Sequence, residues 1–178
     1  MKNLSLLSIL IYIATGLYSK NFNHYKLPYK DSIELVNTWQ KFKLSLELKD
    51  KNTLRRLSLK TVHCDLSQTP NLNASFEQNV NNSYISFDKF LVQFYHNSSI
   101  SKLRAAIKTS KYYIGESEMH IHPPNIYNQK TKSIILYDVS YITIKPNETA
   151  KGNEGESEGF EFIKIDGKYK FFGLTSVP

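Results

Sequence analysis

The chain has 178 residues, of which 40% are hydrophobic and 22% charged, and its formal net charge is +7 at pH 7. This length suits one domain with a single core, and the composition excludes disorder over most of the chain. Twelve tyrosines and ten phenylalanines favour β structure with a ring-lined interior. The basic residues are scattered singly, so we expect a solvated surface and no nucleic acid as a partner.

The first 19 residues have the three regions of a secretory signal peptide. Lys2 supplies a basic start, residues 4–14 form an apolar run, and small residues follow around Gly16 and at Ser19. The run is shorter than the roughly 20 residues that cross a membrane, and no later segment is a candidate span. We therefore predict a signal peptide over residues 1–19, one domain over residues 20–178, and export to a bacterial periplasm or the medium.

The first part of the mature chain predicts an amphipathic helix. It begins at Asp31 or Ser32, either of which is a good N-cap, and runs to about Lys49. Apolar residues recur within it at spacings of three and four, as one buried helix face requires. These apolar positions are Leu35, Trp39, Phe42 and Leu46.

Shorter elements are expected next. A short helix is followed by a short strand over residues 59–64 and by a long polar loop over residues 65–83. Two more helices come after this loop. The residues expected to open the three helices are Asn52 or Thr53, Ser86, and Ser99 or Ser101.

The C-terminal part changes to strands. Residues 111–121 predict one strand, with a bulge at Gly115, and residues 133–144 predict a long strand that has no cleanly polar face. Two strand-like runs, 160–165 and 168–174, are joined by Asp166-Gly167. An Asp-Gly pair between such runs is the strongest short hairpin signal, because a type I′ turn needs positive φ at both central positions.

This hairpin also predicts a register. Phe162 should lie opposite Phe171, and Phe160 opposite Gly173, so that one face of the hairpin is aromatic. Helices followed by antiparallel strands are typical of an α+β domain. We therefore predict N-terminal helices packed on a curved, cone-like antiparallel sheet that ends in the Asp-Gly hairpin.

Two segments resemble the nuclear transport factor 2-like superfamily, which includes ketosteroid isomerases and polyketide cyclases. Residues 48–57 look like the end of its first helix and its short second helix, and residues 159–174 look like its final hairpin. The resemblance implies a bent sheet wrapped against helices, with a pocket at the open end of the cone. The composition and the signal are similar to those of exported bacterial members. No residue here matches the carboxylate base of the isomerase-like members, and a shared fold does not imply a shared activity.

The aromatic residues are the candidates for lining such a pocket. Our first hypothesis is a non-enzymatic binding or interaction module for a small-molecule or glycan ligand, with no cofactor. A homodimer formed through a sheet face is compatible with it. The candidate ligand-binding residues are Trp39, Tyr113, Tyr137, Tyr141 and Tyr169.

The alternative is a small isomerase, dehydratase or cyclase-type enzyme. Asp138 would transfer protons in it, with Tyr137 or Tyr141 beside it. Alternation along the strand places both tyrosines on one face and Asp138 on the other. Only one of the two sets can therefore line a pocket.

Metal and redox chemistry are weakly indicated. His120 and His122 lie on the same side of an extended strand, which suits a shared metal, but a third ligand at a defined spacing is missing. We predict no metal site and treat them as a solvated strand end. Cys64 is the only cysteine, so we expect no intrachain disulfide and a buried structural thiol.

Overall fold

The computed structural model describes residues 29–64, 78, 82–119 and 134–177; the predicted signal peptide, His120, His122 and most of the predicted polar loop lie outside these residues. The helices are α2 (Tyr29–Glu47), α3 (Lys51–Leu57), α5 (Phe87–His96), a 3-10 turn η2 (Ser98–Ile100) and α6 (Ser101–Thr109). The strands are β1 (Ser58–Cys64), β2 (Tyr84–Ser86), β3 (Tyr113–Met119), β4 (Ile134–Ile144), β5 (Glu156–Ile165) and β6 (Lys168–Val177). None of the described helices has the length and apolar character needed to span a membrane.

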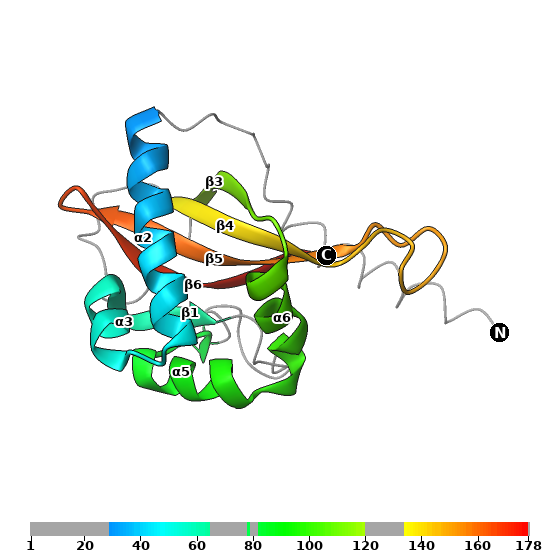
Figure 1. Ribbon diagram of the computed structural model, residues 1–178, viewed down its shortest axis with the longest axis horizontal. Coiled ribbons are helices and arrows are strands. Elements are labelled where there is room, and N and C mark those ends of the chain that lie inside the picture. Colours follow the sequence, from blue (N-terminus) through cyan, green and yellow to red (C-terminus); the bar gives the residue numbers. More distant parts are fainter. Residues whose placement is uncertain (1–28, 65–77, 79–81, 120–133, 178) are drawn as a thin grey trace.

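The strands form one six-stranded sheet in the order β2-β1-β6-β5-β4-β3, and α2 crosses its strands (Figure 1). The α+β class is confirmed, but the sheet is mixed and not wholly antiparallel, because β1 runs parallel to β6. The periodicity of a sequence identifies strands without naming their partners. The last four strands form an antiparallel meander through β3, β4, β5 and β6.

The closing hairpin has the predicted turn. Asp166 and Gly167 adopt φ values of 49° and 73°, and Phe162 lies opposite Phe171 as expected. Glycine tolerates these left-handed conformations best, followed by asparagine and aspartate, which have short polar side chains. Local turn chemistry therefore sets the pairing of the residues next to the turn of this hairpin.

Farther from the turn, the predicted register is wrong by one residue. Phe160 pairs with Leu174 instead of Gly173, because the register shifts between Glu161 and Phe162. Phe172 is the extra residue of this β-bulge. Phe171 faces the helices and belongs to the main core cluster, whereas Phe172 faces the opposite side of the sheet and belongs to the smaller cluster.

Strand β3 corrects another expectation. Gly115 pairs with Asp138 in an unbroken register, so the bulge predicted at this glycine is absent from the described strand. The three-residue strand β2 was not predicted at all. It is too short for a periodic signal.

The helices bury one face of the sheet in an aromatic core. The Trp39 ring lies 4.7 Å from Phe160, and the Phe42 ring lies 4.7 Å from Phe171, measured between centroids. The four apolar positions predicted for the first helix are all buried. The hairpin's predicted aromatic face is the floor of this core.

The other face of the sheet carries a smaller cluster. It consists of Ile134, Leu136, Ile163 and Phe172. Strand β4 therefore has buried side chains on both of its faces. This explains why residues 133–144 have no polar face in the sequence.

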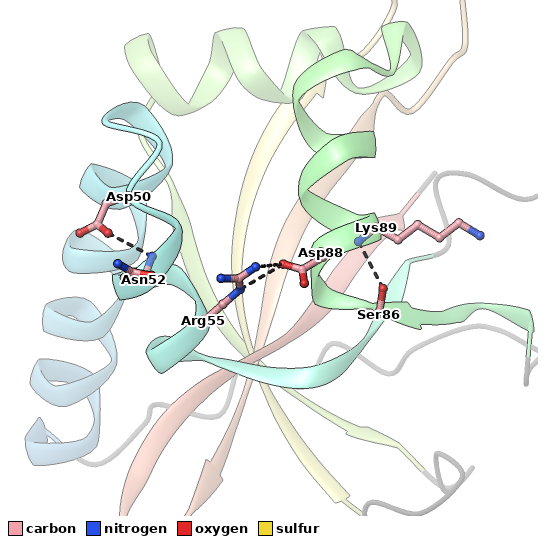
Figure 2. A network of polar contacts seen from close by, with 6 residues as sticks. All are labelled: Asp50, Asn52, Arg55, Ser86, Asp88 and Lys89. Carbon is pink, nitrogen blue, oxygen red and sulfur yellow. Dashed lines mark hydrogen bonds and ion pairs between the residues drawn. The ribbon is translucent and has the colours of Figure 1, made fainter.

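Asp50 begins α3. Its carboxylate accepts a hydrogen bond from the backbone N–H of Asn52 at 3.1 Å (Figure 2). It accepts a second one from the backbone N–H of Thr53, also at 3.1 Å. The predicted caps, Asn52 and Thr53, are therefore wrong by two to three residues. Hydrogen bonds from Thr53 hold the pKa of Asp50 below its usual value.

Ser86 begins α5, as predicted, by accepting a hydrogen bond from the backbone of Lys89 at 3.3 Å. Beside it, Arg55 of α3 donates to Asp88 of α5 at 2.8 Å (Figure 2). Both side chains of this ion pair are more than half exposed, so it contributes little to stability. It mainly fixes how the two helices meet.

Candidate functional site

The predicted ligand-binding residues divide between the two faces of the sheet. Tyr137, Val139 and Tyr141 are alternate residues of β4 that face the helices. Trp39 and Tyr169 pack on the same side of the sheet. Tyr113 pairs with Ser140, which has the opposite parity, and its side chain is 58% exposed. Four of the five residues therefore share the helix-covered face.

Trp39 and Tyr141 lie in the middle of that face and are wholly buried. Their ring centroids are 6.1 Å apart, and neither the indole N–H nor the Tyr141 hydroxyl makes a well-formed hydrogen bond with a described residue. Burial strongly raises the pKa of the Tyr141 hydroxyl. Aromatic side chains fill the space around both rings, so a ligand cannot reach them without repacking the core.

Tyr137 and Tyr169 lie together nearer the start of α2. Their rings meet edge to face at 5.0 Å. Tyr169 is only 3% exposed, and its hydroxyl, although near that of Tyr137, forms no well-aligned hydrogen bond. Tyr137 is half-buried, which leaves this end of the core accessible.

Charged side chains surround the two tyrosines. The Lys164 ammonium lies 2.6 Å from Asp31 Oδ1, 3.3 Å from Glu34 Oε2 and 5.1 Å from the centroid of the Tyr169 ring. Glu116 on β3 is the cross-strand partner of Tyr137. We call this group the tyrosine–carboxylate cluster; its members are Asp31, Glu34, Glu116, Tyr137, Lys164 and Tyr169.

The pKa shifts in the cluster come first from burial and then from its carboxylates. Burial raises the pKa of Tyr137, and the charges of Glu116 and Asp31 raise it further. Burial and then Asp31 raise the pKa of Glu116. The hydrogen bond to Asp31 is the main cause of the raised pKa of Lys164. The single ammonium therefore does not neutralise the carboxylates around it.

Asp138, the predicted proton-transfer residue, lies on the opposite face of the sheet. It belongs to a row of cross-strand partners that spans every strand. In order, this row is Gly115, Asp138, Glu161, Gly173, His63 and Tyr84. We call it the far-face row.

The far-face row brings two carboxylates and an imidazole together. Asp138 and Glu161 are each 1% exposed, and the Ser117 hydroxyl donates to Asp138 Oδ2 at 2.9 Å. Glu161 Oε2 lies 3.5 Å from His63 Nδ1, although β6 separates their strands. Gly173 makes this approach possible because it has no side chain between them. Asp138 and Glu161 are cross-strand partners, so their buried side chains are neighbours on this face of the sheet.

The structure therefore does not bring Asp138 together with Tyr137 and Tyr141. It supplies Ser117, Glu161 and His63 as neighbours instead, and sequence reasoning missed all three in this role. Alternation within each strand could have indicated the parity of Asp138 and of Glu161, but not that the two residues pair. The bulge at Phe172 hid the alignment of Glu161 with Gly173, because a register counted from the turn is one residue off there.

The described residues contain no group of three or more His, Cys, Asp or Glu side chains with a geometry that would hold a metal ion. Cys64 is buried, as predicted. A shallow depression lined by Ile144, Pro146 and Gly155 lies at the ends of β4 and β5, apart from both polar groups. The protein is thus an α+β protein whose described residues include a partly exposed tyrosine–carboxylate cluster on the helix-covered face of the sheet and buried carboxylates on the other face. No protein-family model matches the chain, and no curated protein was found to match it.

Proposed function

We propose that this protein is a non-enzymatic, exported module that binds a small ligand at the tyrosine–carboxylate cluster. The observation that carries the proposal is the Tyr169 hydroxyl, which is buried beside a half-buried Tyr137 and makes no well-formed hydrogen bond with a described residue. Leaving a buried hydroxyl unsatisfied is costly, and a ligand that accepts or donates there removes the cost. Binding sites commonly combine aromatic walls with a few convergent polar groups.

Replacing Tyr169 by phenylalanine separates binding from stability. The Tyr169→Phe variant should be as stable as the wild type or more stable by up to about 1 kcal/mol, because it loses a buried hydroxyl that makes no well-formed hydrogen bond. Its affinity for a ligand found by thermal-shift screening should fall about five- to tenfold, since one hydrogen bond is lost. Calorimetric titration and chemical denaturation measure the two effects.

Tyr113→Phe is the matched control, because this tyrosine is exposed on the other face of the sheet. Its removal should leave ligand affinity unchanged. Equal affinity of the wild type and Tyr169→Phe for every ligand that stabilises the protein would contradict the proposed site. So would a loss of stability in Tyr169→Phe without a change in binding.

The far-face row supports a second candidate function, an isomerase, dehydratase or cyclase-type enzyme. Its support is the pair of buried carboxylates Asp138 and Glu161 next to His63. Adjacent carboxylates that share a proton can supply both an acid and a base for moving a proton next to a carbonyl group. Tyr137 and Tyr141 have no part in this version, because they face the helices.

Deuterium uptake from D2O into small ketones tests this candidate without knowledge of the substrate. The wild type should accelerate the exchange, and Asp138→Asn should lower the rate about 100-fold, as loss of a general base does. Tyr141→Phe should exchange at the wild-type rate, since Tyr141 lies on the other face. Exchange no faster than in buffer, or equally fast in Asp138→Asn, would argue against the enzyme.

The location and kinship of the module belong to the same proposal. The signal-peptide pattern of residues 1–19 supports export, and the helix pair and closing hairpin support kinship with the nuclear transport factor 2-like superfamily. Association of two copies through a sheet face is compatible with binding at the cluster. Its tyrosines lie under the start of α2 and not on the opposite face.

A further inference from the structure

The tyrosine–carboxylate cluster is strongly acidic within a basic chain. Asp31 and Glu34 pair with one ammonium, that of Lys164, and Glu116 lies opposite Tyr137, so three carboxylates and one ammonium give the cluster a formal charge of −2. The chain as a whole has a formal charge of +7. The negative field is therefore local and does not follow from composition.

Lys164 satisfies only part of the cluster. Its ammonium is shared between Asp31 and Glu34, and its distances of 2.6 and 3.3 Å leave both of these carboxylates occupied. Glu116 makes no ion pair with any described residue, and Asp31 raises its pKa. One carboxylate at the half-buried edge of the cluster thus has no counter-ion of its own.

The two tyrosines supply the other half of a cation site. The ring of Tyr169 already holds an ammonium at 5.1 Å, that of Lys164, which shows that cation–π contact occurs in this cluster. Tyr137 presents a second ring, and Tyr169 adds a buried hydroxyl that makes no well-formed hydrogen bond and whose pKa the charges of Asp31, Glu34 and Glu116 raise. Aromatic faces combined with carboxylates suit organic cations better than metal ions, which prefer several oxygen ligands.

We propose that the tyrosine–carboxylate cluster binds an organic cation, a primary amine or a quaternary ammonium group. Glu116 is its counter-ion, the Tyr137 and Tyr169 rings are its walls, and the Tyr169 hydroxyl accepts a hydrogen bond from a primary amine. This inference rests on the proposed binding function and names the ligand class of the same site.

Titration of the full-length protein with simple probes tests it. Tetramethylammonium and butylammonium are the cationic probes. Their neutral counterparts of similar shape are tert-butanol and butanol, respectively, and butanoate is the anionic probe. Backbone amide shifts in NMR spectra should report the cations binding at least tenfold more tightly than the neutral and anionic probes. Calcium chloride at equal ionic strength should produce no shifts at the cluster.

Glu116→Gln is the decisive variant. It should fold normally, since Glu116 makes no ion pair whose loss would destabilise the fold, and it should weaken cation binding about tenfold. Glu118→Gln, two residues along the same strand and exposed, is the matched control and should change affinity less than twofold. In the wild type, affinity should also fall as the pH drops through the raised pKa of Glu116, because the protonated carboxyl has no charge. This pH dependence should be weaker in Glu116→Gln, in which only Asp31 and Glu34 are left to gain a proton.

The results separate the inference from the function on which it rests. Equal binding of cations and neutral probes, or unchanged cation affinity in Glu116→Gln, overturns the cation assignment alone. A neutral or anionic ligand that binds the wild type and is weakened by Tyr169→Phe does the same while supporting the binding module. If neither the probes nor any screened ligand shifts a residue of the cluster, both the cation assignment and the binding function are overturned.

Discussion

The Trp39→Ala variant is expected to unfold with a free energy about 3–5 kcal/mol lower than that of the wild type, the range for removing a buried tryptophan. Trp39 has no exposed surface, and replacing it leaves a cavity that the neighbouring rings cannot fill. Its ring neighbours are Phe42, Tyr112, Tyr141, Phe160 and Phe162. Urea denaturation measures the change.

Tyr113→Ala is the control for this experiment. It also removes an aromatic ring, but from an exposed position, so its effect should stay within about 0.5 kcal/mol. Were Trp39→Ala no more harmful than Tyr113→Ala, the rings around Trp39 would enclose free space and the ligand site would extend into the core. The size of the loss therefore bears on function as well as on stability.

The Gly173→Ala variant is expected to lose at least about 2 kcal/mol, as overpacking of a tight contact does. A Cβ at this position would lie 2.5 Å from the carbonyl oxygen of His63 and 2.7 Å from the His63 Cβ. The His63 backbone and the His63 Cβ cannot move away from the new methyl group without separating β6 from β1. Hydrogen exchange should therefore show the amides of β1 losing protection before those of β4.

Gly115→Ala provides the matched control from the other end of the far-face row. A Cβ there meets no atom within 4 Å, and the backbone needs no positive φ. Because alanine is better suited than glycine to a strand interior, this variant should be neutral or more stable by up to about 1 kcal/mol. Equal losses in the two variants would show that glycine is needed for another reason than the contact between β1 and β6.

The two polar groups on opposite faces lead to different kinds of evidence. The tyrosine–carboxylate cluster is partly exposed and is tested by ligands that reach it directly. The far-face row is tested by variants of Asp138, whose carboxylate is buried among side chains of three strands. Because the two groups share no side chain, a variant in one should leave the readout of the other unchanged.

Local patterns in the sequence predicted the elements well. The spacing of Leu35, Trp39 and Phe42 predicted the helix α2 and its buried face, and Ser86 predicted the start of α5. The Asp166-Gly167 turn predicted the closing hairpin and the pairing of Phe162 with Phe171. Each of these depends on neighbours within a few residues, where periodicity and turn chemistry are sufficient.

Contacts between distant segments were beyond this reasoning. The pairing of β1 with β6 joins residues such as His63 and Gly173 that are far apart in the chain, and no local pattern encodes it. The same holds for Lys164, which meets Asp31 across 133 residues. Aromatic residues gave no means of telling a pocket wall from a filled core, since both need large apolar rings.

The sequence alone thus determined the α+β class, the helices and hairpin, the aromatic character of the interior and the separation of Asp138 from Tyr137 and Tyr141 by strand parity. Only the tertiary structure decided that Trp39 and Tyr141 fill the core, that Tyr137 and Tyr169 gather carboxylates at its edge, and that Asp138 meets Glu161 and His63. The physical reason is that parity and periodicity act along one segment. Burial and charge pairing depend on which segments the fold places side by side.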